Sequence, residues 1–134
     1  MKPVCLVLGA GAGIGGNVGK RFAQAGYHSV LCRRTDKDGL TKLVSDIERD
    51  GGSASGFLIN AVEPDGIEDR VAAVEADIGP IEVVVYNLGA QIGDRALKDT
   101  TYKAFELGWR MATFGLFRVA SAVCPLMEGR GSGT

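Results

Sequence analysis

The residues best suited to chemistry in this sequence are glycines near its start. They alternate with other residues in the run Gly9-Ala10-Gly11-Ala12-Gly13-Ile14-Gly15, directly after the apolar stretch Val4–Leu8. Glycine has no Cβ, so such a loop can turn tightly and let an anion approach its main-chain N–H groups. Where the loop leads into a helix, the helix N-terminus adds positive potential. The spacing predicts binding of a dinucleotide pyrophosphate. The alternative is a glycine loop that only packs a helix close to a strand.

Two arginines, Arg33 and Arg34, follow the second predicted strand, His28–Cys32. In NAD-binding proteins an acidic residue at this point accepts hydrogen bonds from the ribose hydroxyls, and this sequence has none there. A guanidinium group can bind a phosphate through paired hydrogen bonds. The arginines therefore favour NADP, which carries a 2′-phosphate, over NAD. The alternative is a solvated loop.

Further polar candidates follow the third and fourth predicted strands, residues 56–59 and 81–86. Asn60 and Ala61 follow the third, where the Asn60 amide could hydrogen-bond an adenine edge or cap a helix that begins at Pro64. Asn87 and Gly89 follow the fourth. Asn87 could lie near the ribose of the dinucleotide or close a local Asx turn.

Composition excludes several other classes of function. The net charge is −1 over 134 residues, which gives no reason to expect nucleic acid or an anionic membrane as a partner. Cys5, Cys32 and Cys124 lack metal-ligand spacing, so we expect buried free thiols of a reducing compartment and no metal site. No apolar run approaches a membrane span and no signal peptide is recognisable, so we expect a cytoplasmic protein.

The elements that must position these residues alternate between strand and helix. Apolar residues mark one face of each predicted helix and glycines end the helices; the face residues are Ile14, Val18 and Phe22, then Leu40, Leu43, Val44 and Ile47, then Ile67, Val71, Val74 and Ile78. In the first helix Gly15 and Gly19 keep one face thin, so we expect this helix to lie close on the sheet. Strands joined by helices of this length must be parallel. We therefore expect an α/β fold, a Rossmann-type doubly wound parallel sheet with strand order 3-2-1-4, truncated before a fifth strand.

The spacing G-x-x-x-G-x-G from Gly9 and the run Tyr86-Asn87-Leu88-Gly89 resemble the short-chain dehydrogenase/reductase family. Many members have Thr where Leu8 stands and Asn-Asn-Ala-Gly at the second motif. The resemblance implies an oxidoreductase that transfers hydride between a nicotinamide and a carbonyl or alcohol substrate. The expected cofactor-binding residues are Gly9, Gly11, Gly13, Ile14, Gly15, Arg33, Arg34, Asn60, Ala61, Asn87 and Gly89, with NADP as cofactor and NAD less favoured.

The catalytic residues of that family are missing from this sequence. Its members use a Ser and a Tyr-x-x-x-Lys pair, in which the Lys lowers the Tyr pKa. Here the residues four places after Tyr27, Tyr86 and Tyr102 are Leu31, Ala90 and Glu106, and Ala112 stands where the family often has a catalytic Asn. We therefore expect residues 1–134 to be the NADP-binding part of an oxidoreductase, inactive alone, with its C-terminal catalytic half absent. The alternative is a non-catalytic NADP(H)-binding or regulatory module.

A last predicted helix, from about Thr101 to Met127, is apolar on nearly every side. Such a helix cannot lie on a sheet with one face in water, so it needs two partners. The resemblance implies that one partner is the sheet and the other a second copy of the chain, which predicts a homo-oligomer formed through this helix. The alternative is a helix enclosed within a larger monomer.

Overall fold

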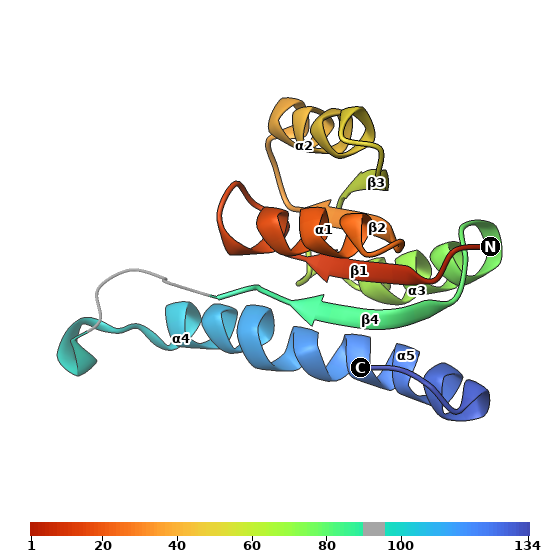
Figure 1. Ribbon diagram of the computed structural model, residues 1–134. Coiled ribbons are helices and arrows are strands. Elements are labelled where there is room, and N and C mark those ends of the chain that lie inside the picture. The colour runs from red at the N-terminus through yellow and green to blue at the C-terminus, as the bar shows by residue number, and fades with distance from the viewer. Residues whose placement is uncertain (90–95) are drawn as a thin grey trace.

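A computed structural model describes residues 1–89 and 96–134, and a parallel sheet forms its centre (Figure 1). The four strands are β1 (Val4–Leu8), β2 (His28–Arg33), β3 (Ser53–Leu58) and β4 (Ile81–Tyr86). Their order is β3-β2-β1-β4, and each neighbouring pair runs parallel, which confirms the predicted sheet. The register aligns Leu8 with both Cys32 and Tyr86. The segments that follow β1, β2 and β4 therefore leave the sheet at one edge.

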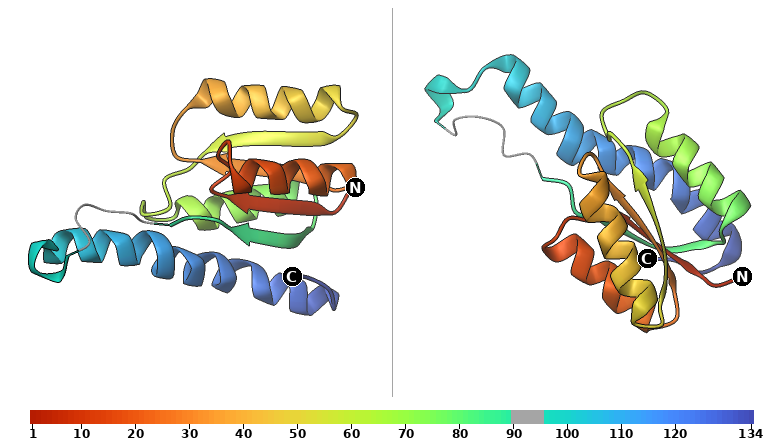
Figure 2. Two further views of the ribbon diagram at one scale, coloured as in Figure 1. Left: turned by 60° about the vertical axis from the view of Figure 1, so that its left-hand side comes forward. Right: turned by 90° about the horizontal axis from the view of Figure 1, so that it is seen from above.

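Helices cover both faces of the sheet (Figure 2). On one face lie α1 (Ile14–Gln24) and α2 (Lys37–Arg49). On the other lie α3 (Gly66–Asp77) and a helix continuous from Tyr102 to Arg130, which we call the long helix. The long helix consists of α4 (Tyr102–Trp109), a π-helical turn at Arg110–Phe114 and α5 (Gly115–Arg130), and a short 3-10 helix, η1 (Leu97–Asp99), precedes it.

The core has two halves, one on each face of the sheet. Val4, Leu6 and Leu8 of β1 pack with residues of α3 and α5, whereas Cys5 and Val7 pack with residues of α1 and α2. This alternation follows from the two-residue period of a strand. Because helices cover both faces, every residue of β1 is buried. The uninterrupted apolar run of β1 is typical of a parallel strand covered on both sides.

Helix α1 contacts the sheet through its smallest residues, which confirms the thin face predicted at Gly15 and Gly19, whereas Ile14 of the predicted apolar face is exposed. Gly15, Gly16, Gly19 and Ala23 are the buried residues of α1, while the side chain of Ile14 is 72% exposed. Val18 and Phe22 are half-buried beside the core. Glycine lets the helix axis approach the strands more closely than any larger residue would. The close approach places the start of α1 directly above the end of β1.

Two predicted boundaries around β3 are also wrong. The strand begins at Ser53, three residues earlier than the predicted Gly56, and it ends at Leu58. Its early residues are held by the neighbouring strand, since the two ring nitrogens of His28 hydrogen-bond the hydroxyls of Ser53 (2.5 Å) and Ser55 (2.9 Å). The next helix begins at Gly66, so Pro64 precedes α3 instead of occupying its first turn.

The π-helical turn of the long helix lies where the end of β4 meets it. The Tyr86 hydroxyl donates a hydrogen bond to the main-chain carbonyl of Met111. A Cβ on Gly115 would overlap that hydroxyl, so glycine is needed for this approach. Burial raises the pKa of the Tyr86 phenol, which keeps it protonated as a donor. The long helix ends at Arg130, three residues beyond the predicted Met127.

The long helix packs on the sheet side through a few residues and exposes many others. Val119 and Val123 are buried, whereas Phe105, Trp109 and Phe117 are 71%, 47% and 66% exposed. By length and composition the helix could cross a membrane, with a mean hydropathy of 1.2 over its most apolar window, contrary to the expectation that no run approaches a span. The core helix of an α/β protein passes the same test, so this is weak evidence.

The segment after the long helix returns to the outer edge of β4. Gly131 ends the helix with a φ of 72°. The Thr134 N–H then donates to the Glu82 carbonyl and the Thr134 carbonyl accepts from the Val84 N–H, both at 2.9 Å. These bonds bracket Val83 in the pattern of a parallel ladder. Val83, Val84 and Val85 are half-buried.

Candidate nucleotide-binding site

The glycine loop is fixed to the ends of three strands. The N–H groups of Gly9 and Ala10 both donate to the Cys32 carbonyl, at 2.9 and 2.8 Å. The Asn87 side chain donates to the Gly9 carbonyl at 3.2 Å, so it ties the loop after β4 to the glycine loop. Gly9 has a φ of 92°, and a Cβ there would overlap the Asn87 carbonyl oxygen. Only glycine fits both conditions.

The first turn of α1 offers unpaired N–H groups beside open space. The Gly16 N–H donates to the Gly11 carbonyl at 2.9 Å and the Asn17 N–H to the Gly13 carbonyl at 3.2 Å. Among the loop and cap hydrogen bonds of the described residues, none has the N–H of Ile14 or Gly15 as donor. The exposed position of the Ile14 side chain is compatible with its predicted role, because the main-chain N–H would bind the anion.

Arg33, the last residue of β2, is held against the glycine loop. Its Nε donates to the Ala10 carbonyl at 2.9 Å, and its Nη1 lies 3.1 Å from Oδ2 of Asp36. The side chain is only 12% exposed. Arg34 is exposed. The two arginines therefore differ: Arg33 is mostly buried and held by two contacts, and Arg34 lies at the surface.

A cavity at this edge of the sheet brings together five of the predicted residues. Gly9, Arg33, Arg34, Asn60 and Ala61 line it. Its other lining residues are apolar side chains that the sequence analysis did not single out: Leu8, Cys32, Ile59, Leu88 and Met111. Apolar side chains together with two arginines suit an aromatic base attached to a phosphate. The remaining predicted residues do not line this cavity; they belong to the glycine loop, the first turn of α1 and the segment after β4.

Asn60 forms a turn in the structure. Its Oδ1 accepts from the Val62 N–H at 3.2 Å, and its main-chain carbonyl accepts from the Glu63 N–H at 3.1 Å. Asn60 therefore does not cap a helix at Pro64, since α3 begins later with Asp65 as its N-cap residue. Among the described residues, the structure records no hydrogen bond of the Asn60 Nδ2 group. It is the donor that an adenine edge could use.

Arg118 is a residue of this region that sequence reasoning missed. It lies in α5 and donates to both carboxylate oxygens of Glu68, at 2.8 and 2.7 Å. It also donates to the carbonyls of Ala61 (2.7 Å) and Glu63 (2.9 Å). These bonds connect α3 and the segment after β3 to the long helix. Residues 50 or more positions apart are joined here, so no local pattern could have revealed the contact.

The cysteines are not reactive groups of the site. Burial raises the pKa of the Cys5 and Cys32 thiols to about 12, so neither forms a thiolate at neutral pH. Cys124 is exposed, which corrects the expectation that all three thiols are buried. Within residues 1–89 and 96–134 no group of three or more His, Cys, Asp and Glu residues could hold a metal ion.

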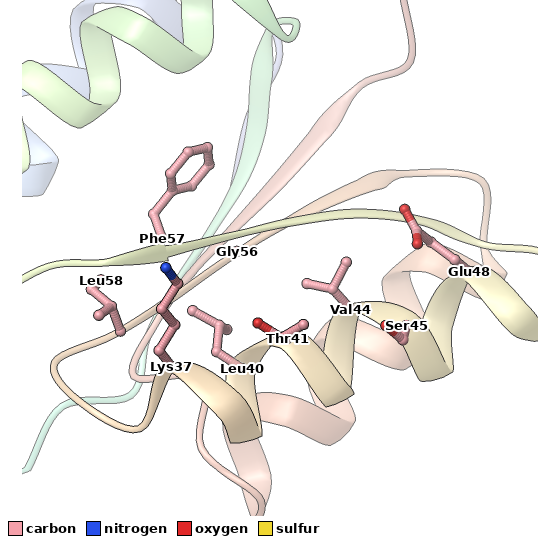
Figure 3. Close-up of a pocket in the computed structure, with 9 residues that line it drawn as sticks. All are labelled: Lys37, Leu40, Thr41, Val44, Ser45, Glu48, Gly56, Phe57 and Leu58. Carbon is pink, nitrogen blue, oxygen red and sulfur yellow. The ribbon is translucent and has the colours of Figure 1, made fainter.

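A second, more open groove lies between α2 and β3 (Figure 3). Leu40 and Val44 project from α2 toward the strand, and Leu40 packs so closely on Gly56 that a Cβ there would lie 2.8 Å from its Cγ. Phe57 points to the other side of the strand, where the Arg70 guanidinium lies 3.8 Å from its ring centroid. None of the residues that line this groove was predicted to bind a ligand. The cavity beside Arg33 is therefore the candidate site.

Comparison with known proteins agrees with this geometry. Residues 3–134 match the family described as short chain dehydrogenase. The chain is 34% identical over 129 residues to a gluconate 5-dehydrogenase of Gluconobacter oxydans, and 30% identical over 132 residues to a fatty acyl-CoA reductase of Acinetobacter baylyi. It also resembles the crystal structure of a variant actinorhodin polyketide ketoreductase with NADPH, with 30% identity and a TM-score of 0.89 over 98% of this chain.

The chain thus belongs to the short-chain dehydrogenase/reductase family, and its fold is the Rossmann-like α/β sheet of that family. The match to the gluconate 5-dehydrogenase includes 96% of this chain but only 49% of that protein. The match to the fatty acyl-CoA reductase includes 97% of this chain but only 44% of that protein. This chain covers 51% of the ketoreductase chain. The chain therefore spans about half the length of the relatives it matches.

Proposed function

We propose that residues 1–134 form the NADP(H)-binding part of a short-chain dehydrogenase/reductase-like oxidoreductase. The observation that carries this proposal is the position of Arg33 and Arg34, which border an apolar cavity at the end of β2 where no acidic residue stands. An adenine ring would pack against the apolar residues of this lining. The guanidinium groups would then bind the 2′-phosphate.

Each predicted residue has a role in this proposal that its position allows. The N–H groups of Ile14 and Gly15 would bind the pyrophosphate. Gly11 and Gly13 would let the pyrophosphate approach the main chain, since a Cβ built on Gly11 or on Gly13 meets nothing within 4 Å. Gly9 keeps the loop against β4 through Asn87. Asn60 and Ala61 would border the adenine, and Asn87 and Gly89 the adjoining ribose. The bound dinucleotide would supply the hydride for a carbonyl substrate or accept one from an alcohol.

The sequence lacks the tyrosine–lysine pair that the resemblance implies as proton donor. No tyrosine is followed four places later by a lysine, and the Tyr86 hydroxyl donates a hydrogen bond to a main-chain carbonyl. We therefore propose that the 134-residue chain alone does not oxidise NADPH, and that small carbonyl or alcohol compounds are substrates of the complete enzyme. We propose the cytoplasm as its location.

A non-catalytic module that binds NADP(H) is the second candidate. It is favoured by the same missing pair and by Ala112, which has no polar group at a position that is catalytic in many members of the family. A reading frame that continues through a Tyr-x-x-x-Lys motif would decide for the enzyme. Turnover by the complete protein with any aldehyde or ketone would do the same.

We further propose that the complete protein associates through the outer face of the long helix. Phe105, Trp109, Phe114, Leu116 and Phe117 are each at least 40% exposed, and the rings of Trp109 and Phe114 stack at 5.3 Å. Exposed apolar surface of this extent marks an interaction site. Light scattering should give the mass of an oligomer, and Phe117→Glu should lower it. Leu58→Glu, which changes an exposed apolar residue of β3, is the control that should not.

Calorimetric titration with NADPH and NADH tests the cofactor proposal. The unmodified protein should bind NADPH more tightly. A lost charge-assisted hydrogen bond is worth about 1.5–3 kcal/mol, so Arg33→Ala should weaken NADPH binding by about ten- to a hundredfold and leave NADH nearly unchanged. Arg34→Ala tests the second guanidinium, and Arg21→Ala, on the far end of α1, is the control. Equal or tighter binding of NADH by the unmodified protein would refute the proposal.

A further inference from the structure

Asp36 lies between the candidate site and the start of α2, and its two carboxylate oxygens have different partners. Oδ1 accepts from the Gly39 N–H at 3.1 Å, which caps α2. Oδ2 lies 3.1 Å from Nη1 of Arg33. The Asp36 side chain is 65% exposed, whereas that of Arg33 is 12% exposed. A solvated acid thus holds the more buried of the two site arginines.

The contacts of Arg33 show what an incoming phosphate would meet. Arginine has five N–H donors. One is used by the Ala10 carbonyl and one by Asp36, so the guanidinium is already neutralised by a carboxylate at bonding distance. Arg33 lines the cavity at the end of β2 and also a groove that contains Asp36, between α1 and α2. Any anion bound by the free Arg33 donors would therefore lie close to the carboxylate of Asp36.

We propose that Asp36 is a specificity-determining residue that limits the preference of the site for a 2′-phosphorylated dinucleotide. Its carboxylate competes with the phosphate for Arg33 and repels the phosphate charge. NADH has no phosphate at this position, so neither this competition nor this repulsion acts on it. The inference rests on the proposed NADP(H) site and adds to it a residue that weakens the selectivity that Arg33 provides.

Asn is a suitable probe at this position for two structural reasons. Asp36 has a left-handed backbone with a φ of 63°, which Asn tolerates better than most residues. Asn is also as good an N-cap residue as Asp, so the bond to the Gly39 N–H can persist. Asp36→Asn should therefore leave the fold intact and remove only the charge. Asp38→Asn is the matched control, because Asp38 lies in the first turn of α2 and makes no ion pair with Arg33 in the described structure.

Calorimetric titrations of both variants with NADPH and NADH test the inference. Asp36→Asn should raise NADPH affinity about three- to tenfold at low ionic strength, because a surface charge facing a phosphate of nearly two charges is removed. NADH affinity should change less than twofold, and Asp38→Asn should alter neither. The gain should shrink near 0.5 M salt, where charges are screened within about 4 Å.

Two results would contradict the inference, and they have different meanings. If the unmodified protein binds NADPH but Asp36→Asn binds it no more tightly, with α-helical circular dichroism retained, Asp36 is only a helix cap and the inference alone is wrong. If the unmodified protein binds neither dinucleotide, the proposed cofactor site is wrong and the inference falls with it.

Discussion

Replacing Gly15 by alanine should destabilise the fold far more than the same change at Gly13. A Cβ on Gly15 would overlap the Gly9 carbonyl oxygen and lie 2.9 Å from the Gly9 carbonyl carbon and 3.0 Å from the Ala10 Cα. All three atoms belong to the main chain, so no flexible side chain can move aside. A Cβ on Gly13 would meet nothing within 4 Å. The two glycines are neighbours in the loop but differ in what surrounds them.

The size of the difference follows from these contacts. Overpacking costs about 1–3 kcal/mol, and contacts with main-chain atoms belong at the upper end of that range. Alanine regains about 1 kcal/mol of helix propensity at position 15, which leaves a net loss of about 2 kcal/mol. Gly13 is the N-cap residue, where alanine is less favourable than glycine by about 0.5 kcal/mol. The difference corresponds to about 6 °C in melting temperature for a domain of this size.

Thermal unfolding followed by circular dichroism measures this difference, and titration with NADPH completes the comparison. Gly129→Ala is the control: a Cβ there meets nothing within 4 Å inside α5, so it should stabilise by up to about 1 kcal/mol. Gly13→Val, which fills the predicted access to the pyrophosphate, should abolish dinucleotide binding while the protein stays folded. Equal melting temperatures for the Gly13 and Gly15 alanine variants, or full affinity in Gly13→Val, would refute this description of the loop.

Three further predictions concern other parts of the chain. Hydrogen bonds from Arg118 lower the pKa of Glu68 from its ordinary 4.5, so this pair stabilises the protein above pH 4.5 and less below it. Glu68→Gln should therefore lower the free energy of unfolding by about 1 kcal/mol at neutral pH. Urea unfolding should show that this loss vanishes as the pH falls below 4.5. Iodoacetamide at about pH 8 should label Cys124 and spare Cys5 and Cys32, which mass spectrometry would show. The 134-residue chain should self-associate and leave NADPH absorbance unchanged with aldehydes, ketones and quinones; a stable monomer that turns over any of them would contradict this.

The sequence predicted the strands that are mainly apolar. The bounds predicted for Val4–Leu8 and residues 81–86 agree with the structure, because short runs of mainly apolar, β-branched residues between turn residues are strong signals for parallel strands. The start of β3 was missed because Ser53 and Ser55 are polar and are held by His28 of the neighbouring strand. The close approach of α1 through Gly15 and Gly19 was predicted, whereas Ile14, expected on the apolar face of this helix, is exposed.

The candidate site was predictable where residues follow strand ends. Arg33 and Asn60 lie at the edge where parallel strands end, so their approach to one cavity follows from topology. The contacts that hold them were not predictable. Arg118 reaches Ala61 across 57 positions, and the pairing of Arg33 with Asp36 depends on a left-handed residue at 36 that the sequence does not mark. Exposure of Cys124 depends likewise on which side of the long helix meets the sheet.

The central claim is that the glycine loop and Arg33 together bind NADP(H), and a crystal structure of the protein with NADPH tests it most directly. The account predicts pyrophosphate oxygens within about 3.2 Å of the N–H groups of Ile14 or Gly15, and the 2′-phosphate within the same distance of the Arg33 guanidinium. It also predicts the adenine in the cavity bordered by Asn60. A nucleotide bound elsewhere, or a 2′-phosphate that contacts neither Arg33 nor Arg34, would contradict it.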